Sequence, residues 1–205
     1  MRAGSDRGCR GAGCCAQTEP MLSTWQLPKT VTFGHTTYRL HTDFRDILEI
    51  FSYFDREELP AFMRWQIALG LFYDPQVAPE HTRQAMDFLA EFINGGSAPQ
   101  NAGPKLLDWQ LDADLIIADV NRVAGTELRA QPYVHWWTFL AWFHAIGQGQ
   151  LSTVVSIRDA LRRGQKLEGW QKTYLQENRS RVLLQKPLTE SEKAHKAALE
   201  KMLTK

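Results

Sequence analysis

The chain has 205 residues and a net charge of +1, and 43% of its residues are hydrophobic. A near-neutral charge gives no general argument for binding nucleic acid or a membrane surface, and no apolar run approaches the roughly 20 residues of a transmembrane helix. The composition, with seven tryptophans and ten phenylalanines, is that of one soluble domain with an aromatic core.

The first part of the chain, residues 1–24, is predicted to be a disordered extension. It is rich in glycine and arginine, shows no periodicity, and lacks the apolar core of a secretory signal. It holds all three cysteines of the chain, Cys9, Cys14 and Cys15. Their spacing does not suit a zinc site. The later sequence has no cysteine, which fits a reducing cytoplasm. Both Met1 and Met21 stay open as the start of translation.

A β-hairpin is predicted at the beginning of the structured part, residues 25–184. Residues 30–33 and 36–40 are rich in β-branched and aromatic side chains, and they flank a two-residue turn, Gly34-His35. The later segments have helical patterns. The predicted fold class is therefore mainly α, a multi-helix bundle with a short N-terminal β-hairpin.

Three helices are predicted to follow, over residues 43–54, 57–73 and 79–93. Apolar residues recur in each at spacings of three and four, which indicates one buried stripe per helix. The stripes are Phe44, Ile47, Leu48 and Phe51; Phe62, Trp65, Leu69 and Phe72; and Ala85, Phe88, Leu89, Phe92 and Ile93. Residues 97–105 are then expected to form an exposed loop.

A fourth predicted helix, over residues 112–124, carries the densest group of carboxylates. These are Asp112, Asp114 and Asp119. Carboxylate oxygens can hold a divalent ion. Carboxylates at the beginning of a helix also cap backbone N–H groups and suit the helix dipole, and this second interpretation is favoured.

The most apolar helix is predicted over residues 132–146. Large apolar side chains surround it, so we expect it to be buried on all sides and to be the central element. Its two histidines, His135 and His144, lie nine residues apart on nearly opposite sides, which excludes a metal pair on one face. Both are expected to be core or boundary residues.

The last quarter of the chain is basic. Residues 156–205 hold 12 basic and 6 acidic residues, whereas residues 43–119 hold 14 acidic and 5 basic ones. These charges indicate either two solvated faces that attract each other or a basic arm that docks on an acidic partner. The candidate partner-binding residues are Arg158, Arg162, Arg163, Trp170, Lys172, Arg179 and Arg181. A single-stranded nucleic-acid site of basic and aromatic side chains is the less favoured alternative.

Helices in this last quarter are predicted over residues 151–163, 171–184 and 190–203. The third follows a capping box, Thr189-Glu-Ser-Glu192. Because only a few of its residues are apolar, residues 185–205 are expected to form a separate helical arm.

No catalytic motif stands out along the chain. There is no GxSxG, Walker or kinase motif, and Gly147-Gln-Gly149 follows a helix instead of the strand that precedes a phosphate-binding turn. We therefore predict a binding protein and not an enzyme, with no catalytic residues, no metal ligands and no cofactor.

The order of these elements resembles the bacteriophage "gene product fifteen" family of Gram-positive siphophages. The likeness runs from about residue 27 to residue 181, and the block around Trp136-Trp137 is its most specific part. The matching motifs are Thr42-Asp43-Phe44-Arg45, Phe92-Ile93-Asn94-Gly95-Gly96, Asp112-Ala113-Asp114, His135-Trp136-Trp137-x-Phe139 and Ile157-Arg158. The loop Gly125-Thr126-Glu127-Leu128 departs from the family pattern.

The resemblance implies a phage or prophage tail-morphogenesis protein without catalytic residues. The expected role is a tail-assembly chaperone in the bacterial host cytoplasm that binds the tape-measure or tail-tube protein. A structural component of the finished tail is the alternative, and a metal-dependent enzyme using Asp112 and Asp114 is a weaker one. The resemblance leaves open the oligomeric state and any fusion with an upstream product.

Overall fold

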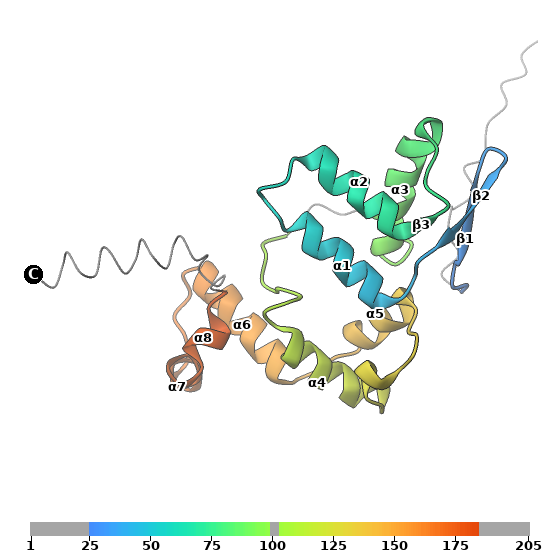
Figure 1. Cartoon of the computed structure of the whole chain (residues 1–205). Helices are drawn as coiled ribbons and strands as arrows, with labels where there is room; N and C mark the ends of the chain where they lie inside the picture. The colour runs from blue at the N-terminus through green and yellow to red at the C-terminus, as the bar shows by residue number, and fades with distance from the viewer. Residues whose placement is uncertain (1–24, 99–102, 185–205) are drawn as a thin grey trace, which may run out of the picture.

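The computed structural model describes residues 25–98 and 103–184, and this part of the chain is mainly α-helical, as predicted (Figure 1). In Figure 1 the hairpin and the helices before residue 94 form one group, most of the helices after residue 112 form another, and α5 (Trp136–His144) lies between the two groups. No helix in the described ranges is long and apolar enough to cross a membrane. The predicted extension over residues 1–24, the capping box and the arm over residues 185–205 lie outside the described residues.

The predicted hairpin forms two strands of a three-stranded antiparallel sheet of order β1-β2-β3. The strands are β1 (Thr30–Phe33), β2 (Thr36–Leu40) and β3 (Tyr73–Asp74). Val31 faces Tyr38 in the register, and Gly34 supplies the positive φ of 58° that the turn requires. The prediction missed β3 because two residues at the end of a helix carry no strand pattern of their own.

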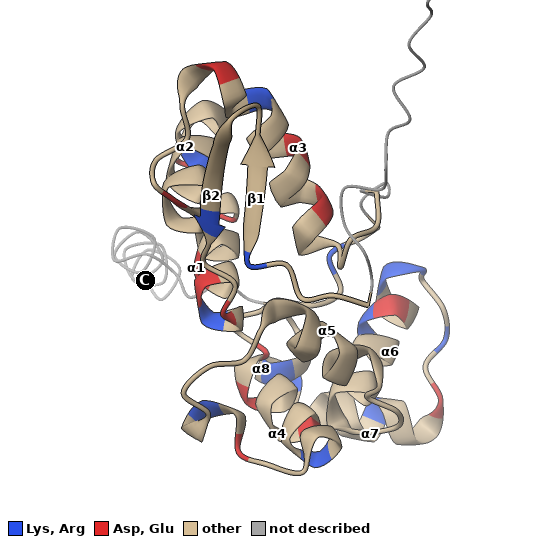
Figure 2. Cartoon of the chain, turned by 90° about the vertical axis from the view of Figure 1, so that its right-hand side faces the viewer, with Lys and Arg blue, Asp and Glu red and all other residues tan. Residues whose placement is uncertain are grey.

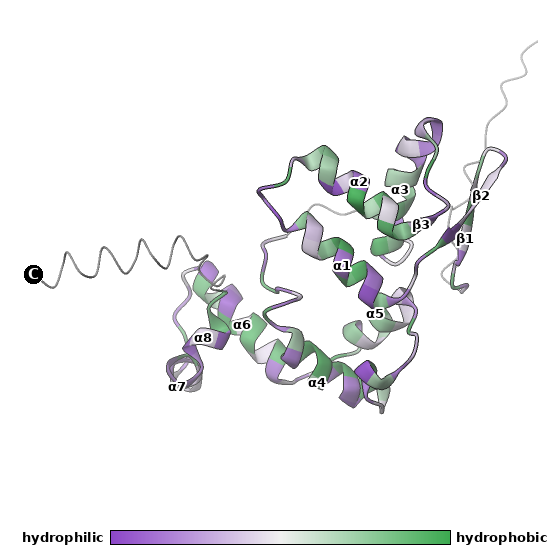
Figure 3. Cartoon of the chain, in the orientation of Figure 1, coloured by the Kyte–Doolittle hydropathy of each residue, from purple (hydrophilic) through white to green (hydrophobic). Residues whose placement is uncertain are grey.

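The helices lie where the apolar periodicity predicts them, with shifted ends, except that the one predicted over residues 171–184 is divided into two at Asn178. They are α1 (Phe44–Phe54), α2 (Ala61–Phe72), α3 (Thr82–Ile93), α4 (Ala113–Ala124), α5 (Trp136–His144), α6 (Gln150–Arg162), α7 (Gly169–Glu177) and α8 (Arg179–Val182). Two 3-10 turns, η1 (Pro79–His81) and η2 (Leu128–Ala130), precede α3 and follow α4. Hydrophobic residues run along α1, α2 and α4 (Figure 3).

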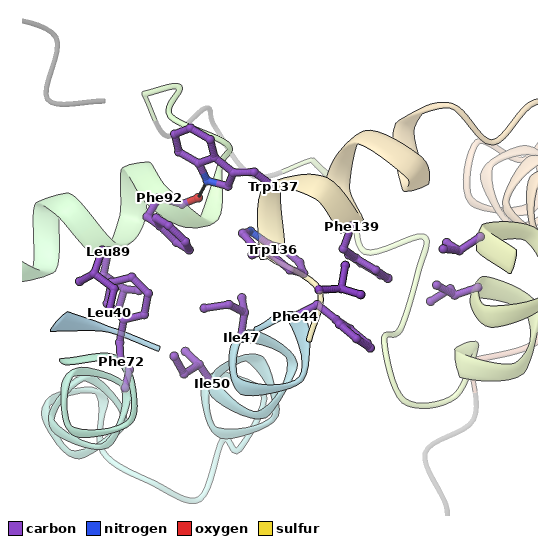
Figure 4. Close-up of a cluster of buried hydrophobic side chains, with 14 of the residues drawn as sticks. Leu40, Phe44, Ile47, Ile50, Phe72, Leu89, Phe92, Trp136, Trp137 and Phe139 are labelled. Carbon is purple, nitrogen blue, oxygen red and sulfur yellow. Dashed lines mark hydrogen bonds between the residues drawn. The ribbon is translucent and has the colours of Figure 1, made fainter. Parts of the chain in front are cut away.

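The core lies where α1, α2, α3 and α5 meet (Figure 4). Ile47 and Ile50 of α1 are fully buried; in Figure 4 Ile47 lies near Trp136 and Ile50 lies on the side of Phe72. Phe44 and Phe139 stack with ring centroids 5.1 Å apart, which joins the beginning of α1 to α5. This packing makes α5 the link between the two helix groups, as its composition predicts.

The helix predicted over residues 132–146 is shorter and less buried than expected. Val134 and His135 are extended because they pair with the segment before α1: Phe44 N donates to Val134 O, and Asp43 forms a bridge with His135. The first half of α5 is buried, but Ala141 and His144 in its second half are exposed. The expectation of burial on all sides is wrong because neighbouring elements cover only the first half of the helix.

The stripe predicted for α2 is also only partly buried. Leu69 and Phe72 lie in the core, but Phe62 is 64% exposed. The whole first turn, residues 61–63, is exposed, so no described element covers this end of the stripe. The two helices that are apolar on more than one side therefore both leave apolar side chains uncovered.

Candidate protein-binding surfaces

His135 fixes the beginning of α5. Its Nδ1 accepts a hydrogen bond from the backbone N of Trp137 at 3.1 Å, and its Nε2 lies 3.1 Å from the carbonyl oxygen of Pro28. A neutral imidazole with its hydrogen on Nε2 satisfies both contacts. Burial lowers the pKa of His135, which favours that neutral form. The expectation of a buried histidine is confirmed here, whereas His144 is exposed.

The paired tryptophans of α5 hold the end of α3. The indole Nε1 of Trp137 donates to Phe92 O at 2.8 Å, and that of Trp136 donates to Ile93 O at 2.9 Å (Figure 4). The last carbonyls of a helix have no partner within it, and the two indoles bond to two of them; Phe92 O also accepts from Gly95 N at 3.0 Å. Both tryptophans are therefore held in place beside the turn that follows α3.

An open groove of about 480 Å³, here called the α5 groove, lies against this turn. Its lining is mostly apolar and combines α5, the end of α3 and the segment before β1: Leu27, Gly95, Trp137, Leu140, Ala141 and His144. Leu27 is 50% exposed at its edge. A groove of this composition can take the apolar side chains of a partner helix.

A second groove of about 440 Å³, here called the α2 groove, runs between α2 and the segment before α3. It is lined by Gln66, Leu69, Gly70, Val77, Pro79 and Thr82. The exposed Phe62 lies one turn before Gln66 on the same face of α2 and so extends the groove. The acidic Glu80 is exposed next to Pro79 in one wall, and Glu58 is exposed before the first turn of α2.

A third, more polar cavity of about 530 Å³ lies beside the hairpin and includes Lys29, Arg39, His41 and Tyr133. Its carboxylates have structural partners or are partly buried. Asp43 accepts hydrogen bonds from Arg45 N and Val134 N at 2.9 Å, and burial followed by the charge of Asp43 raises the pKa of Asp46. In the described ranges no three His, Cys, Asp or Glu side chains are grouped to hold a metal ion.

The predicted aspartate group does not converge on one point. Asp112 occupies the cap position of α4, but its side chain makes no capping bond there. Its carboxylate instead accepts from Asp108 N and from the guanidinium of Arg158. The capping interpretation is wrong for this side chain because a tertiary ion pair takes its oxygens. Asp119 does cap a helix, but a different one: it accepts from Leu151 N at the beginning of α6.

The seven candidate partner-binding residues divide into one buried and six at least partly exposed. Arg158 is 7% exposed, and it donates to Asp112 and to the carbonyls of Leu106, Arg181 and Val182. The prediction that Arg158 is a partner-binding residue on an exposed basic face is wrong, because α8 packs over its side chain. The other six lie on α6, α7 and α8 or just after α6: Arg162, Arg163, Trp170, Lys172, Arg179 and Arg181. Figure 2 shows lysines and arginines in blue on this part of the chain.

Two of these six are already paired on their own helix. Arg162 and Arg163 lie 2.9 and 2.8 Å from the carboxylate of Asp159. Trp170 is 53% exposed. The sequence prediction did not include the two apolar grooves, although α2 and α5 show apolar residues on more than one side, a signal that can indicate a binding surface as well as a core.

A family model described as "Bacteriophage Gp15 protein" matches residues 24–184. The match includes both grooves, the paired tryptophans and the buried Arg158. No curated protein and no solved structure shows a significant match to the chain.

Proposed function

The chain belongs to the bacteriophage Gp15 protein family, and from this membership we propose that it is a non-enzymatic tail-assembly factor. It acts as a chaperone in the host cytoplasm, where it binds tape-measure or tail-tube protein before polymerisation. The observation that carries this proposal is the α5 groove, an apolar surface open to solvent on the most apolar helix of the described fold.

The chemistry of the α5 groove supports a helical partner. Leu27, Leu140 and Ala141 offer apolar contacts, and His144 lies near one end of them. An amphipathic helix places apolar side chains into such a groove at positions i, i+3, i+4 and i+7. Because His135, Trp136 and Trp137 fix the floor, the groove is formed before the partner arrives, which lowers the ordering cost of binding.

The exposed basic residues supply a second contact in this proposal. They are Arg162, Arg163, Trp170, Lys172, Arg179 and Arg181. Exposed charges of this kind attract an acidic partner, and they increase its association rate more than they increase the affinity of the complex. Binding through them should therefore weaken as salt is raised, whereas binding in the α5 groove should not.

Co-expression with the tape-measure protein of the same phage tests the proposal. The tagged wild-type chain should recover the tape-measure protein, and Leu27→Asp should lose that recovery because it puts a charge into the groove. Leu161→Asp, at an exposed leucine of α6 with 39% exposure, is the matched control and should keep it. Equal recovery by both variants, or recovery of neither tape-measure nor tail-tube protein by the wild type, would refute the proposal.

Mass spectrometry of purified virions separates a chaperone from a structural component. A chaperone should be absent from the particle. A stoichiometric amount of the chain in the finished tail would instead assign it to the tail structure.

A further inference from the structure

We propose that the segment over residues 185–205 docks in the α2 groove of its own chain. The inference rests on the chemistry of the groove, the chemistry of the segment and the place where the described chain ends. It does not depend on the tail-assembly role.

The α2 groove combines an apolar floor with an acidic rim. Leu69, Val77 and Pro79 line it, and the exposed ring of Phe62 extends it along α2. Two exposed carboxylates, Asp74 and Glu80, lie on the segment between α2 and α3 that borders it, and a third, Glu58, lies before the first turn of α2. Within the described ranges no lysine or arginine forms an ion pair with any of the three. An occupant should therefore be apolar along one side and basic at the edges of that side.

Residues 193–205 have that composition. They hold four lysines and one acidic residue: Lys193, Lys196, Lys201, Lys205 and Glu200. At helical spacing Leu199, Met202 and Leu203 share one side. Lys196 then falls at one edge of this side and Lys205 lies beyond Met202 toward the other, whereas Lys201 lies on the opposite side of the helix, so Lys196 and Lys205 are the lysines that can meet the carboxylates.

The described chain ends next to the connection that leads into α2. Val182 is fully buried, and its carbonyl accepts from Arg158 Nε at 2.7 Å. The same guanidinium holds the carbonyl of Leu106 at 3.0 Å. The preceding residue, Lys105, is ion-paired at 2.8 Å to Asp55, the residue after α1. The segment therefore leaves the domain near the residues that join α1 to α2.

The segment is long enough to reach the groove from this point. Its 21 residues span about 30 Å as a helix and about 70 Å when extended. Docking within one chain also gives a high effective concentration, so weak contacts suffice. A protein that binds the α2 groove from outside would have to displace the segment.

Carbodiimide coupling of the full chain tests this inference, because it joins a lysine amine to a carboxylate only when the two are in contact. Mass spectrometry should find Lys196 or Lys205 joined to Glu58, Asp74 or Glu80. A mixture of ¹⁵N-labelled and unlabelled chains should show that each product comes from a single chain.

Phe62→Asp should lower the yield of these products about tenfold, the loss expected when one aromatic side chain no longer buries its surface. Because Phe62 is exposed, the variant should fold, and its melting temperature checks this. Leu161→Asp should leave the yield unchanged. Coupling of the lysines to other carboxylates, coupling only between different chains, no coupling, or an unchanged yield in Phe62→Asp would each overturn the proposal.

Discussion

Arg158 and Asp112 form an ion pair inside the molecule, with Nη1 2.6 Å from Oδ2 and Nη2 2.8 Å from Oδ1. Their side chains are 6% and 1% exposed. The pair joins α6 to the beginning of α4, and the same guanidinium also holds the carbonyls of Leu106, Arg181 and Val182. One side chain therefore fixes the arrangement of three segments that are far apart in the sequence.

Arg158→Ala should destabilise the fold strongly, because it leaves Asp112 as an uncompensated buried charge. A loss of about 3–5 kcal/mol in the free energy of unfolding is expected. Urea denaturation measures it. Arg162→Ala is the matched control, since it removes an exposed ion pair on the same helix and should cost less than about 1 kcal/mol. A small loss in both variants would contradict a structural role for Arg158.

The contrast between Arg158 and Arg162 shows what periodicity can and cannot predict. Apolar spacing locates the helices, because burial of one stripe is a local property of each segment. It does not locate Arg158, since the carbonyls and carboxylate that satisfy its guanidinium come from other segments of the chain. It also does not locate the grooves, because an apolar side chain looks the same in sequence whether a neighbouring helix covers it, as for Phe72, or none does, as for Phe62.

Gly149→Ala should be destabilising for a reason unrelated to backbone angles. A Cβ at this position would lie 2.7 Å from both carboxylate oxygens of Asp119, the side chain that accepts from Leu151 N at the beginning of α6. Displacing that cap should cost about 1–3 kcal/mol in thermal or urea unfolding. Gly147→Ala is the control, because its Cβ would meet no atom within 4 Å. Equal effects of the two substitutions would argue against the contact.

Trp137→Phe tests the support of the α5 groove. The phenyl ring keeps most of the packing but removes the indole donor, which leaves Phe92 O with the bond from Gly95 N alone and takes away one link between α5 and α3. We expect a loss of about 0.5–1.5 kcal/mol in the free energy of unfolding, the net worth of one hydrogen bond. Trp170→Phe, at an exposed position, should change it by less than about 0.5 kcal/mol. If the two variants unfold alike, the indole hydrogen bond contributes nothing.

Gly70→Ala should stabilise the protein. Gly70 lies inside α2, and a Cβ there would meet no atom within 4 Å. Alanine is the better helix former by about 1 kcal/mol, so the melting temperature should rise. A lowered melting temperature would mean that something occupies this part of the α2 groove closely enough to clash with one methyl group.

His135 should make stability depend on pH. Burial lowers its folded pKa below the ordinary value of 6.5, so the neutral ring is favoured in the folded protein. A depressed folded pKa gives stability that is fully present above pH 6.5 and is lost as the pH falls through the folded pKa. Protonation would also place a hydrogen on Nδ1, which faces the backbone N–H of Trp137.

The measurement is the free energy of unfolding in urea between about pH 7.5 and pH 5. The wild type should lose stability over this interval. His135→Asn keeps a side chain that can cap α5 but cannot titrate. Its profile should therefore lack the loss of stability that protonation of His135 causes. His144→Asn, at an exposed position, should keep the wild-type slope. Parallel profiles for the wild type and His135→Asn would show that the histidine does not sense pH through its cap, and the loss would then belong to the carboxylates.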